Sequence, residues 1–184
     1  RILIDGVDIS KVTLRSLRKQ MGVMMQDSFI FGGTIMDNIR YGNKTATDEE
    51  VIRAAKTVCA HDFIMQMEDG YQTQVNERGS RLSVGQRQLI SFARALLADP
   101  AILILDEATS SIDTETEIVL QEGLNHLLKG RTSFIIAHRL STIQNADCIM
   151  YISDGGIAEA GTHEELLQKH GKYYELYEAQ YKSV

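Results

Sequence analysis

The feature that most constrains the fold is a long amphipathic helix pattern that leads directly into a short apolar segment ending in two acidic residues. The helix pattern begins after Ser83 and stops at Asp99-Pro100, because the residue before a proline disfavours helical geometry. Ile102 to Leu105 follows without polar alternation, which predicts a parallel strand buried on both faces. Asp106 and Glu107 come next. A helix placed between buried strands indicates an α/β fold with a mostly parallel sheet.

Two further apolar runs add strands to the predicted sheet. Gly22 to Met25 and Ser133 to Ala137 are short and unbroken, and they are followed by Gln26 and His138. Because the carboxyl ends of parallel strands meet at one edge, we expect Gln26, His138 and the acidic pair to share that edge, where ligands bind in such sheets. Strand ends are also polar simply where a core stops, so the four residues together, rather than any one, carry the prediction.

The rest of the chain adds a hairpin and a helical region. Asp5-Gly6 between Ile2–Ile4 and Val7–Ile9 predicts an N-terminal hairpin. Thr34 to about Met67 has a helical pattern with a polar face, whereas Tyr71–Arg81 shows no period and predicts a loop. The alternation of strands and helices again favours an open α/β sheet.

Two predicted helix starts carry polar caps. Ser83 and Gln86 form an S-x-x-Q capping box, and Asp113 caps a second helix. Glycine in a first helical turn costs up to about 1 kcal/mol relative to alanine, so Gly85 suggests that a ligand approaches the backbone closely. Free amides and the helix dipole would form an anion site there. The simpler interpretation is a well-started helix.

The acidic pair suits phosphate chemistry. A carboxylate at the end of a strand, Asp106, can hold hydrated Mg²⁺, and its neighbour Glu107 can orient or deprotonate an attacking water. The alternative is a carboxylate pair that begins a solvated loop.

Length and composition limit the possible folds and partners. The 184 residues support one good core, and a formal net charge of −6 argues against non-specific nucleic-acid binding.

These motifs closely resemble the nucleotide-binding domain of ATP-binding cassette (ABC) transporters, especially the exporter type. Leu82–Gln86 resembles the signature motif of the family, although Val84 stands where the family most often has glycine. Ile102–Glu107 resembles the Walker B strand. Other segments resemble the D-loop, the X-loop and the exporter pattern after the Q-loop, namely Ser110–Asp113, Glu77–Gly79, Phe29–Phe31 and Thr34–Ile39.

The resemblance implies a P-loop NTPase-like (RecA-like) fold, with a mostly parallel sheet core and an α-helical subdomain that bears the signature motif. Residues 27–98 would form the helical subdomain, and residues 1–26 and 99–184 the α/β core. The family's Walker A loop and aromatic adenine platform would lie upstream, since no GxxxxGK[ST] occurs in the sequence. We therefore expect a domain incomplete at its N-terminus, with exposed apolar surface and no ATPase activity of its own.

The resemblance also assigns roles to the candidate site residues. ATP and Mg²⁺ would be the cofactors, with Glu107 as catalytic carboxylate, Asp106 supporting Mg²⁺, His138 contacting the γ-phosphate, and Gln26 sensing Mg²⁺ and the attacking water. The remaining residues would act across a head-to-tail dimer with a second nucleotide-binding domain: Ser83, Gly85 and Gln86 on ATP held by that domain, and Asp113 at the interface.

The implied function is the ATP-hydrolysing motor of an exporter, working with transmembrane domains at the cytoplasmic side of the membrane, without a nucleic-acid partner. Two alternatives stay open. The first is a non-enzymatic, degenerate half-site partner that donates only its signature motif. The second is a soluble ABC-type ATPase of DNA repair or translation, although such proteins usually carry coiled-coil insertions or basic surfaces, and this acidic, compact sequence has neither.

Overall fold

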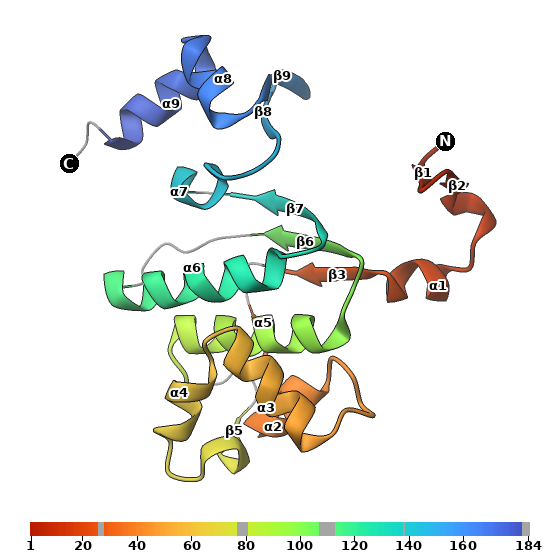
Figure 1. Cartoon of the computed structure of the whole chain (residues 1–184), viewed down its shortest axis with the longest axis vertical. Coiled ribbons are helices and arrows are strands. Elements are labelled where there is room, and N and C mark those ends of the chain that lie inside the picture. Colours follow the sequence, from red (N-terminus) through yellow and green to blue (C-terminus); the bar gives the residue numbers. More distant parts are fainter. Residues whose placement is uncertain (26–27, 77–80, 107–112, 138, 182–184) are drawn as a thin grey trace. The chain divides into compact units, whose positions relative to one another are not determined.

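The computed structural model describes residues 1–25, 28–76, 81–106, 113–137 and 139–181. The chain divides into two compact units, Arg1–Ile136 and Ala137–Val184, which we describe separately (Figure 1). This boundary differs from the boundaries at 26 and 98 that the resemblance implies, and that finer division stays a prediction. Within the described ranges, no helix combines the length and the apolar character needed to span a membrane.

Three parallel strands form the sheet of the first unit, in the order β3-β6-β7 (Figure 1). They are β3 (Met21–Met24), β6 (Ile102–Asp106) and β7 (Thr132–Ile136). The register places Met24 opposite Leu105, and Asp106 opposite Ile136. All three predicted strands therefore form and run the same way, so their carboxyl ends lie at one edge of the sheet.

Helices α5 (Val84–Ala98) and α6 (Thr114–Leu128) pack together and against the sheet. Leu103 and Leu105 of β6 are buried in the same core cluster as Leu89 and Leu124 of these helices. Alternate residues of a strand point to opposite faces, so this packing covers one face of the sheet. The core of the first unit therefore lies between the sheet, α5 and α6, and it continues into the helical region (Figure 1).

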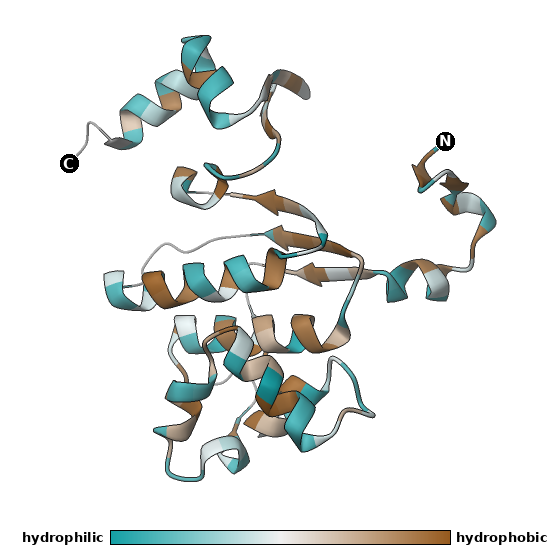
Figure 2. Cartoon of the chain, viewed as in Figure 1, coloured by the Kyte–Doolittle hydropathy of each residue, from teal (hydrophilic) through white to brown (hydrophobic). Residues whose placement is uncertain are grey.

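The opposite face of the sheet stays open among the described residues of this unit. Ile102 and Ile104 are only half-buried, and Val23, Phe134 and Ile136 are 56%, 58% and 56% exposed. The expectation that the apolar strands would be buried on both faces is therefore wrong for the described part of the first unit. An unbroken apolar run shows that both faces of a strand could be buried. Both faces are covered only where a second layer of helices also lies over the sheet. Figure 2 shows the apolar character of these strands.

The predicted N-terminal hairpin is confirmed. Strands β1 (Leu3–Ile4) and β2 (Val7–Asp8) pair antiparallel around Asp5 and Gly6. Both turn residues have positive φ, 49° and 78°, as a tight two-residue turn requires. A 3₁₀ helix, η1 (Ile9–Lys11), and the short α1 (Leu14–Lys19) then lead into β3.

The region between β3 and α5 is mainly helical, and its buried residues belong to the same core cluster as those of β6, α5 and α6. Its elements are β4 (Gly33–Thr34), α2 (Ile35–Arg40), α3 (Asp48–Thr57), α4 (His61–Met65), η2 (Gly70–Gln72) and β5 (Gln74–Val75). Thr34 and Thr47 form capping boxes that start α2 and α3. The expected loop over Tyr71–Arg81 is wrong in part, because Gln74–Val75 of this segment form β5, which pairs antiparallel with β4 in a two-stranded sheet.

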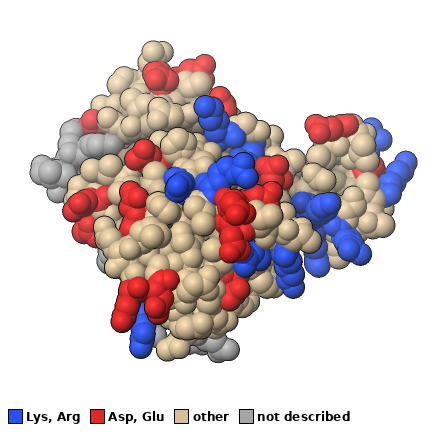
Figure 3. All heavy atoms as spheres, turned by 60° about the horizontal axis from the view of Figure 1, so that its bottom comes forward, with Lys and Arg blue, Asp and Glu red and all other residues tan. Residues whose placement is uncertain are grey.

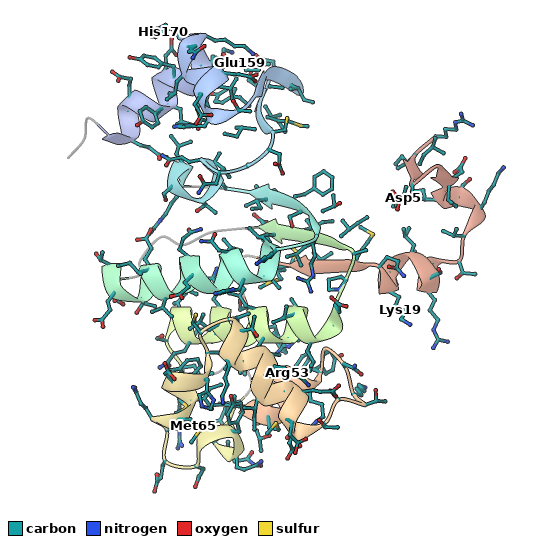
Figure 4. The ribbon with its side chains drawn as sticks, viewed as in Figure 1. Asp5, Lys19, Arg53, Met65, Glu159 and His170 are labelled. Atoms are coloured by element: carbon teal, nitrogen blue, oxygen red, sulfur yellow. The ribbon has the colours of Figure 1, made fainter. Side chains whose placement is uncertain are left out.

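The second unit contains α7 (Leu140–Ile143), β8 (Ile149–Ser153), β9 (Gly156–Gly161), α8 (His163–Gln168) and α9 (Lys172–Tyr181). Strands β8 and β9 form an antiparallel hairpin, and Leu140, Ile149, Leu166 and Tyr173 form a small buried cluster. The Glu159 carboxylate on β9 caps α9 by accepting hydrogen bonds from the backbone N–H groups of Lys172, at 2.6 Å, and Tyr173, at 3.2 Å (Figure 4 labels Glu159).

Candidate functional site

The carboxyl edge of the β3-β6-β7 sheet is where the sequence places the catalytic residues. Asp106, the last residue of β6, is half-buried and pairs with Ile136 at the end of β7. Its position alternates with Leu105, so it belongs to the open face of the sheet together with Ile104. Among the predicted catalytic and Mg²⁺-binding residues, Asp106 alone lies within the described residues.

Gln26, Glu107 and His138 lie outside the described residues. The strands that precede them are described and end at a common edge, because Met24 of β3 lies opposite Leu105 of β6 and β7 ends beside Asp106. The grouping of these three side chains along one edge therefore stays a prediction.

A carboxylate at a strand end fits Mg²⁺, which commonly takes one or two protein carboxylates and completes its octahedron with water and substrate phosphates. Asp106 places one carboxylate at such a position, where it is half-buried. The described residues contain no group of three His, Cys, Asp or Glu side chains that would hold a metal by themselves.

The start of α5 has the predicted capping box. Ser83 Oγ accepts a hydrogen bond from the Gln86 backbone N–H at 3.1 Å, and Gln86 Oε1 accepts one from the Ser83 N–H at 3.0 Å. Ser83 and Val84 are exposed. The box satisfies two amides, while the other first-turn amides of a helix have no acceptor within the helix. This terminus can therefore accept an anion from solvent or from a partner.

Gly85 is buried, and its neighbour is α6. A Cβ atom placed on Gly85 would lie 2.3 Å from Thr116 Cγ2. Close packing of two helices therefore accounts for the glycine, where sequence reasoning invoked the close approach of a ligand. The contact also brings the start of α5 beside the start of α6.

Asp113 is the N-cap of α6. Its Oδ1 accepts a hydrogen bond from the Thr116 backbone N–H at 2.9 Å. That bond, with a smaller contribution from the Thr116 side chain, holds the pKa of the Asp113 carboxyl below its usual range. The predicted D-loop residue and the predicted signature helix thus meet through the Gly85–Thr116 contact, whereas Ser110–Ile112 and Glu77–Gly79 lie outside the described residues.

Sequence reasoning missed a polar cluster next to the segment that follows Gln26. The Asn38 side chain in α2 is 1% exposed and bridges the preceding loop. Its Oδ1 accepts from the Phe31 N–H at 2.9 Å, and its Nδ2 donates to the Phe31 and Thr34 carbonyl oxygens at 2.9 and 3.0 Å. Arg94 of α5 donates to the same asparagine. The available signal was a lone amide among the buried apolar residues of α2.

Charged side chains of both signs are interspersed over much of the face shown in Figure 3, and positive side chains gather towards the end that carries α1. Lys11, Arg15, Arg18 and Lys19 are exposed in that region. This pattern differs from the extended single-sign field that non-specific polyanion binding requires.

The chain is similar in sequence to ABC transporter proteins. A family model described as ABC transporter matches residues 1–110. The chain is 58% identical, over its whole length, to the ABC transporter ATP-binding protein YknV of Bacillus subtilis, and 52% identical over 99% of its length to the ATP-dependent lipid A-core flippase of Syntrophus aciditrophicus. It spans about 30% of the length of each of these relatives.

Among solved structures, a bacterial Atm1-family ABC exporter with ATP bound matches 97% of this chain, with a TM-score of 0.88 and 44% sequence identity. The chain covers 31% of that exporter chain. The match confirms the predicted fold class, an α/β P-loop NTPase-type ATPase fold with a parallel sheet.

Proposed function

Because the chain belongs to the ABC transporter family, we propose that it is part of the ATP-binding and hydrolysing motor of an exporter. The observation that carries the proposal is the parallel β3-β6-β7 sheet, in which Asp106 ends the central strand and Glu107 follows it in the sequence. The relatives support this reading, since one is named a lipid A-core flippase and one solved structure is an ABC exporter with ATP bound.

In the proposed mechanism, Asp106 and Gln26 would hold Mg²⁺, Glu107 would orient and deprotonate the attacking water, and His138 would contact the γ-phosphate. Bound Mg²⁺ would neutralise charge that develops on the phosphate oxygens. The chain's own contribution is positional: β6 ends at Asp106, at the edge where β3 and β7 also end, and Glu107 is the next residue in the sequence. Such placement of a base against a bound water is a large part of phosphoryl-transfer catalysis.

A second nucleotide-binding domain would complete the site. We infer a head-to-tail arrangement in which Ser83, Gly85 and Gln86 bind ATP held by that domain, with Asp113 at the interface. The exposed Ser83 at the start of α5 and the close packing of α5 with α6 support this arrangement, because both starts can then face one partner.

The proposed membrane partner is a transmembrane domain at the cytoplasmic side. The aromatic rings of Phe29 and Tyr41 are 51% and 53% exposed beside the segment that follows Gln26. Exposed aromatic surface in a soluble domain commonly marks a protein contact. We therefore propose Phe29 and Tyr41 as part of the contact with the transmembrane domain.

The test of catalysis is Glu107→Gln in the full-length protein that carries these residues. Turnover is expected to fall about 10²-fold or more, since a positioned general base contributes about 10²–10⁴-fold. Glu68→Gln serves as the matched control, because Glu68 is an exposed carboxylate outside the proposed site. Unchanged turnover in Glu107→Gln would contradict the proposal and favour the alternative of a non-enzymatic half-site partner.

We further propose that the 184 residues by themselves do not hydrolyse ATP, because they contain no GxxxxGK[ST] to hold the β- and γ-phosphates. The chain is titrated with a complete homologous ATP-binding domain. Turnover that rises on mixing would support donation of the signature helix to a composite site. Turnover by the chain alone, well above that of its own Glu107→Gln variant, would contradict the proposed requirement.

A further inference from the structure

We propose that Arg94 is a positioning residue that fixes the segment following Gln26 to α5, so that movement of this segment is passed to the start of the signature helix. The inference rests on the proposed function, since that function gives the two segments their roles on ATP. Arg94 itself would touch neither ATP nor Mg²⁺. Its effect would be exerted through Phe29, Asn38 and the body of α5.

Within the described residues, the side-chain hydrogen bonds of Arg94 all reach the segment from Phe29 to Asn38. Its Nε donates to the Asn38 carbonyl oxygen at 2.9 Å, its Nη1 to the Phe29 carbonyl oxygen at 3.0 Å, and its Nη2 to Asn38 Oδ1 at 3.1 Å. Arg94 is 56 residues from Asn38 and 65 from Phe29 along the chain. A planar guanidinium holds its donors on three separate nitrogens in a fixed plane, which suits two backbone carbonyls and an amide oxygen, whereas the three donors of lysine all lie on one nitrogen at the end of a flexible stem.

Asn38 extends this clamp into the loop. The same Oδ1 that accepts from Arg94 also accepts from the Phe31 N–H, while Nδ2 holds the Phe31 and Thr34 carbonyl oxygens. The loop, the start of α2 and α5 are therefore connected through one buried amide. Displacing any one of them would break several hydrogen bonds in a buried setting, where unsatisfied groups are costly.

Aromatic rings complete the clamp. The Arg94 guanidinium carbon lies 5.2 Å from the centre of the Phe31 ring and 5.9 Å from that of Tyr41. Phe31 stacks on Tyr41 at 4.4 Å and meets Phe29 edge-on at 4.9 Å. The chain leaving α2 also approaches α5 closely, because a Cβ on Gly42 would lie 2.1 Å from the Arg94 carbonyl oxygen.

The choice of arginine points to geometry rather than to stability alone. Burial lowers the pKa of the Arg94 guanidinium, which reflects the cost of removing the cation from water. In the described part of the chain, its hydrogen bonds go to carbonyl oxygens and no carboxylate pairs with it. An apolar side chain could pack at lower desolvation cost, so the presence of a cation at this position favours a role in fixing one conformation.

Helix α5 can carry the displacement. Arg94 lies ten residues beyond the first residue of α5, Val84, which is about 15 Å at 1.5 Å per residue. Between them, Leu89, Ile90 and Phe92 are buried in the core, so the helix is held along its length. A shift at Phe29, three residues after Gln26, would thus be passed to Ser83 by a continuous, packed helix.

The test uses Arg94→Lys in the full-length protein that carries these residues, with Arg53→Lys as the matched control. Arg53 is an exposed arginine on α3 (labelled in Figure 4). We expect Arg94→Lys to lower kcat for ATP about 10- to 100-fold while the KM for ATP stays within about twofold, as misplacement of a catalytic group would. A residue that only supports folding would lower the amount of active protein without this separation of kcat from KM.

A double-mutant cycle with Gln26→Ala tests the link itself. If Arg94 acts through the segment after Gln26, the two substitutions are non-additive, and the double variant is about as slow as the slower single variant. A double variant whose fold loss of kcat equals the product of the two single-variant losses would overturn the inference. So would unchanged kinetics in Arg94→Lys while Glu107→Gln is inactive.

Two further measurements keep the outcomes separate. Arg94→Gln removes the charge and cannot reach both Phe29 and Asn38, so it should reproduce the loss of kcat if Arg94→Lys does not fold. Full activity in Arg94→Gln would overturn the inference. If Glu107→Gln retains turnover, the proposed function fails, and the clamp is then judged by amide hydrogen exchange, which should rise in residues 29–41 of Arg94→Lys and be unchanged in Arg53→Lys.

Discussion

Gly85 of α5 and Thr116 of α6 lie so close that a single added methyl group at Gly85 would overlap the Thr116 methyl, at 2.3 Å. This contact joins the starts of the two helices that the proposed function places at a dimer interface. It gives Gly85 a packing role that is separate from any role on a nucleotide, and the two roles lead to different experiments.

Gly85→Ala is expected to destabilise the protein. Overpacking costs about 1–3 kcal/mol, against a helix-propensity gain of up to about 1 kcal/mol, and the β-branched Thr116 has little freedom to turn away. Thr116→Ser removes the overlapping methyl and should restore much of the lost free energy of unfolding, measured by urea denaturation. Equal destabilisation by Gly85→Ala in both backgrounds would show that the contact is not the cause.

Asp113 should make stability depend on pH in the acidic range. Its pKa in the folded protein lies below its ordinary value of 3.8, because the ionised carboxylate accepts hydrogen bonds from Thr116. The stabilisation is therefore complete above about pH 3.8 and is lost as the pH falls through the lowered folded pKa. Asp113→Asn keeps a capping oxygen but should remove this pH dependence, which thermal unfolding over the acidic range would reveal. Parallel profiles for both proteins would contradict the assignment.

Tyr71 should titrate late in alkali. Burial, helped by the negative charge of Asp62, raises the pKa of Tyr71 to about 12. A raised phenol pKa means that its contribution to stability is present below the ordinary value of 10 and is lost as the pH rises towards 12. Tyrosinate absorbance should show a late component that disappears in Tyr71→Phe. A component that persists in this variant would belong to another tyrosine.

The open face of the sheet should make the 184-residue chain self-associate. Val23 of β3 and Phe134 and Ile136 of β7 are each more than half exposed, and the half-buried Ile104 of β6 lies between Val23 and Phe134 in the register, so the apolar surface is continuous across the sheet. Phe134→Ser should weaken concentration-dependent association in analytical sedimentation, with little loss of stability because the residue is already exposed. A sharp monomer at all concentrations in the unsubstituted chain would contradict the prediction.

Much of the local structure could be predicted because it depends on neighbouring residues. The turn at Asp5-Gly6, the capping box of Ser83 and Gln86, and the end of α5 before Pro100 follow from backbone preferences and hydrogen bonds that span a few positions. Apolar runs likewise predicted the three parallel strands. Among the proposed site residues, those at helix starts and Asp106 lie where the sequence placed them, whereas Gln26, Glu107 and His138 lie outside the described residues.

Residue pattern alone thus determined α5 and its caps, the N-terminal hairpin and the three parallel strands, since these depend on local geometry and periodicity. The tertiary structure decided which face of the sheet is covered, why Gly85 must be glycine, and how Arg94 reaches Asn38, 56 residues away. The physical reason is that packing and long-range hydrogen bonds depend on which surfaces meet. The partner of a lone arginine or asparagine within a helix pattern cannot be predicted from its neighbours in the sequence.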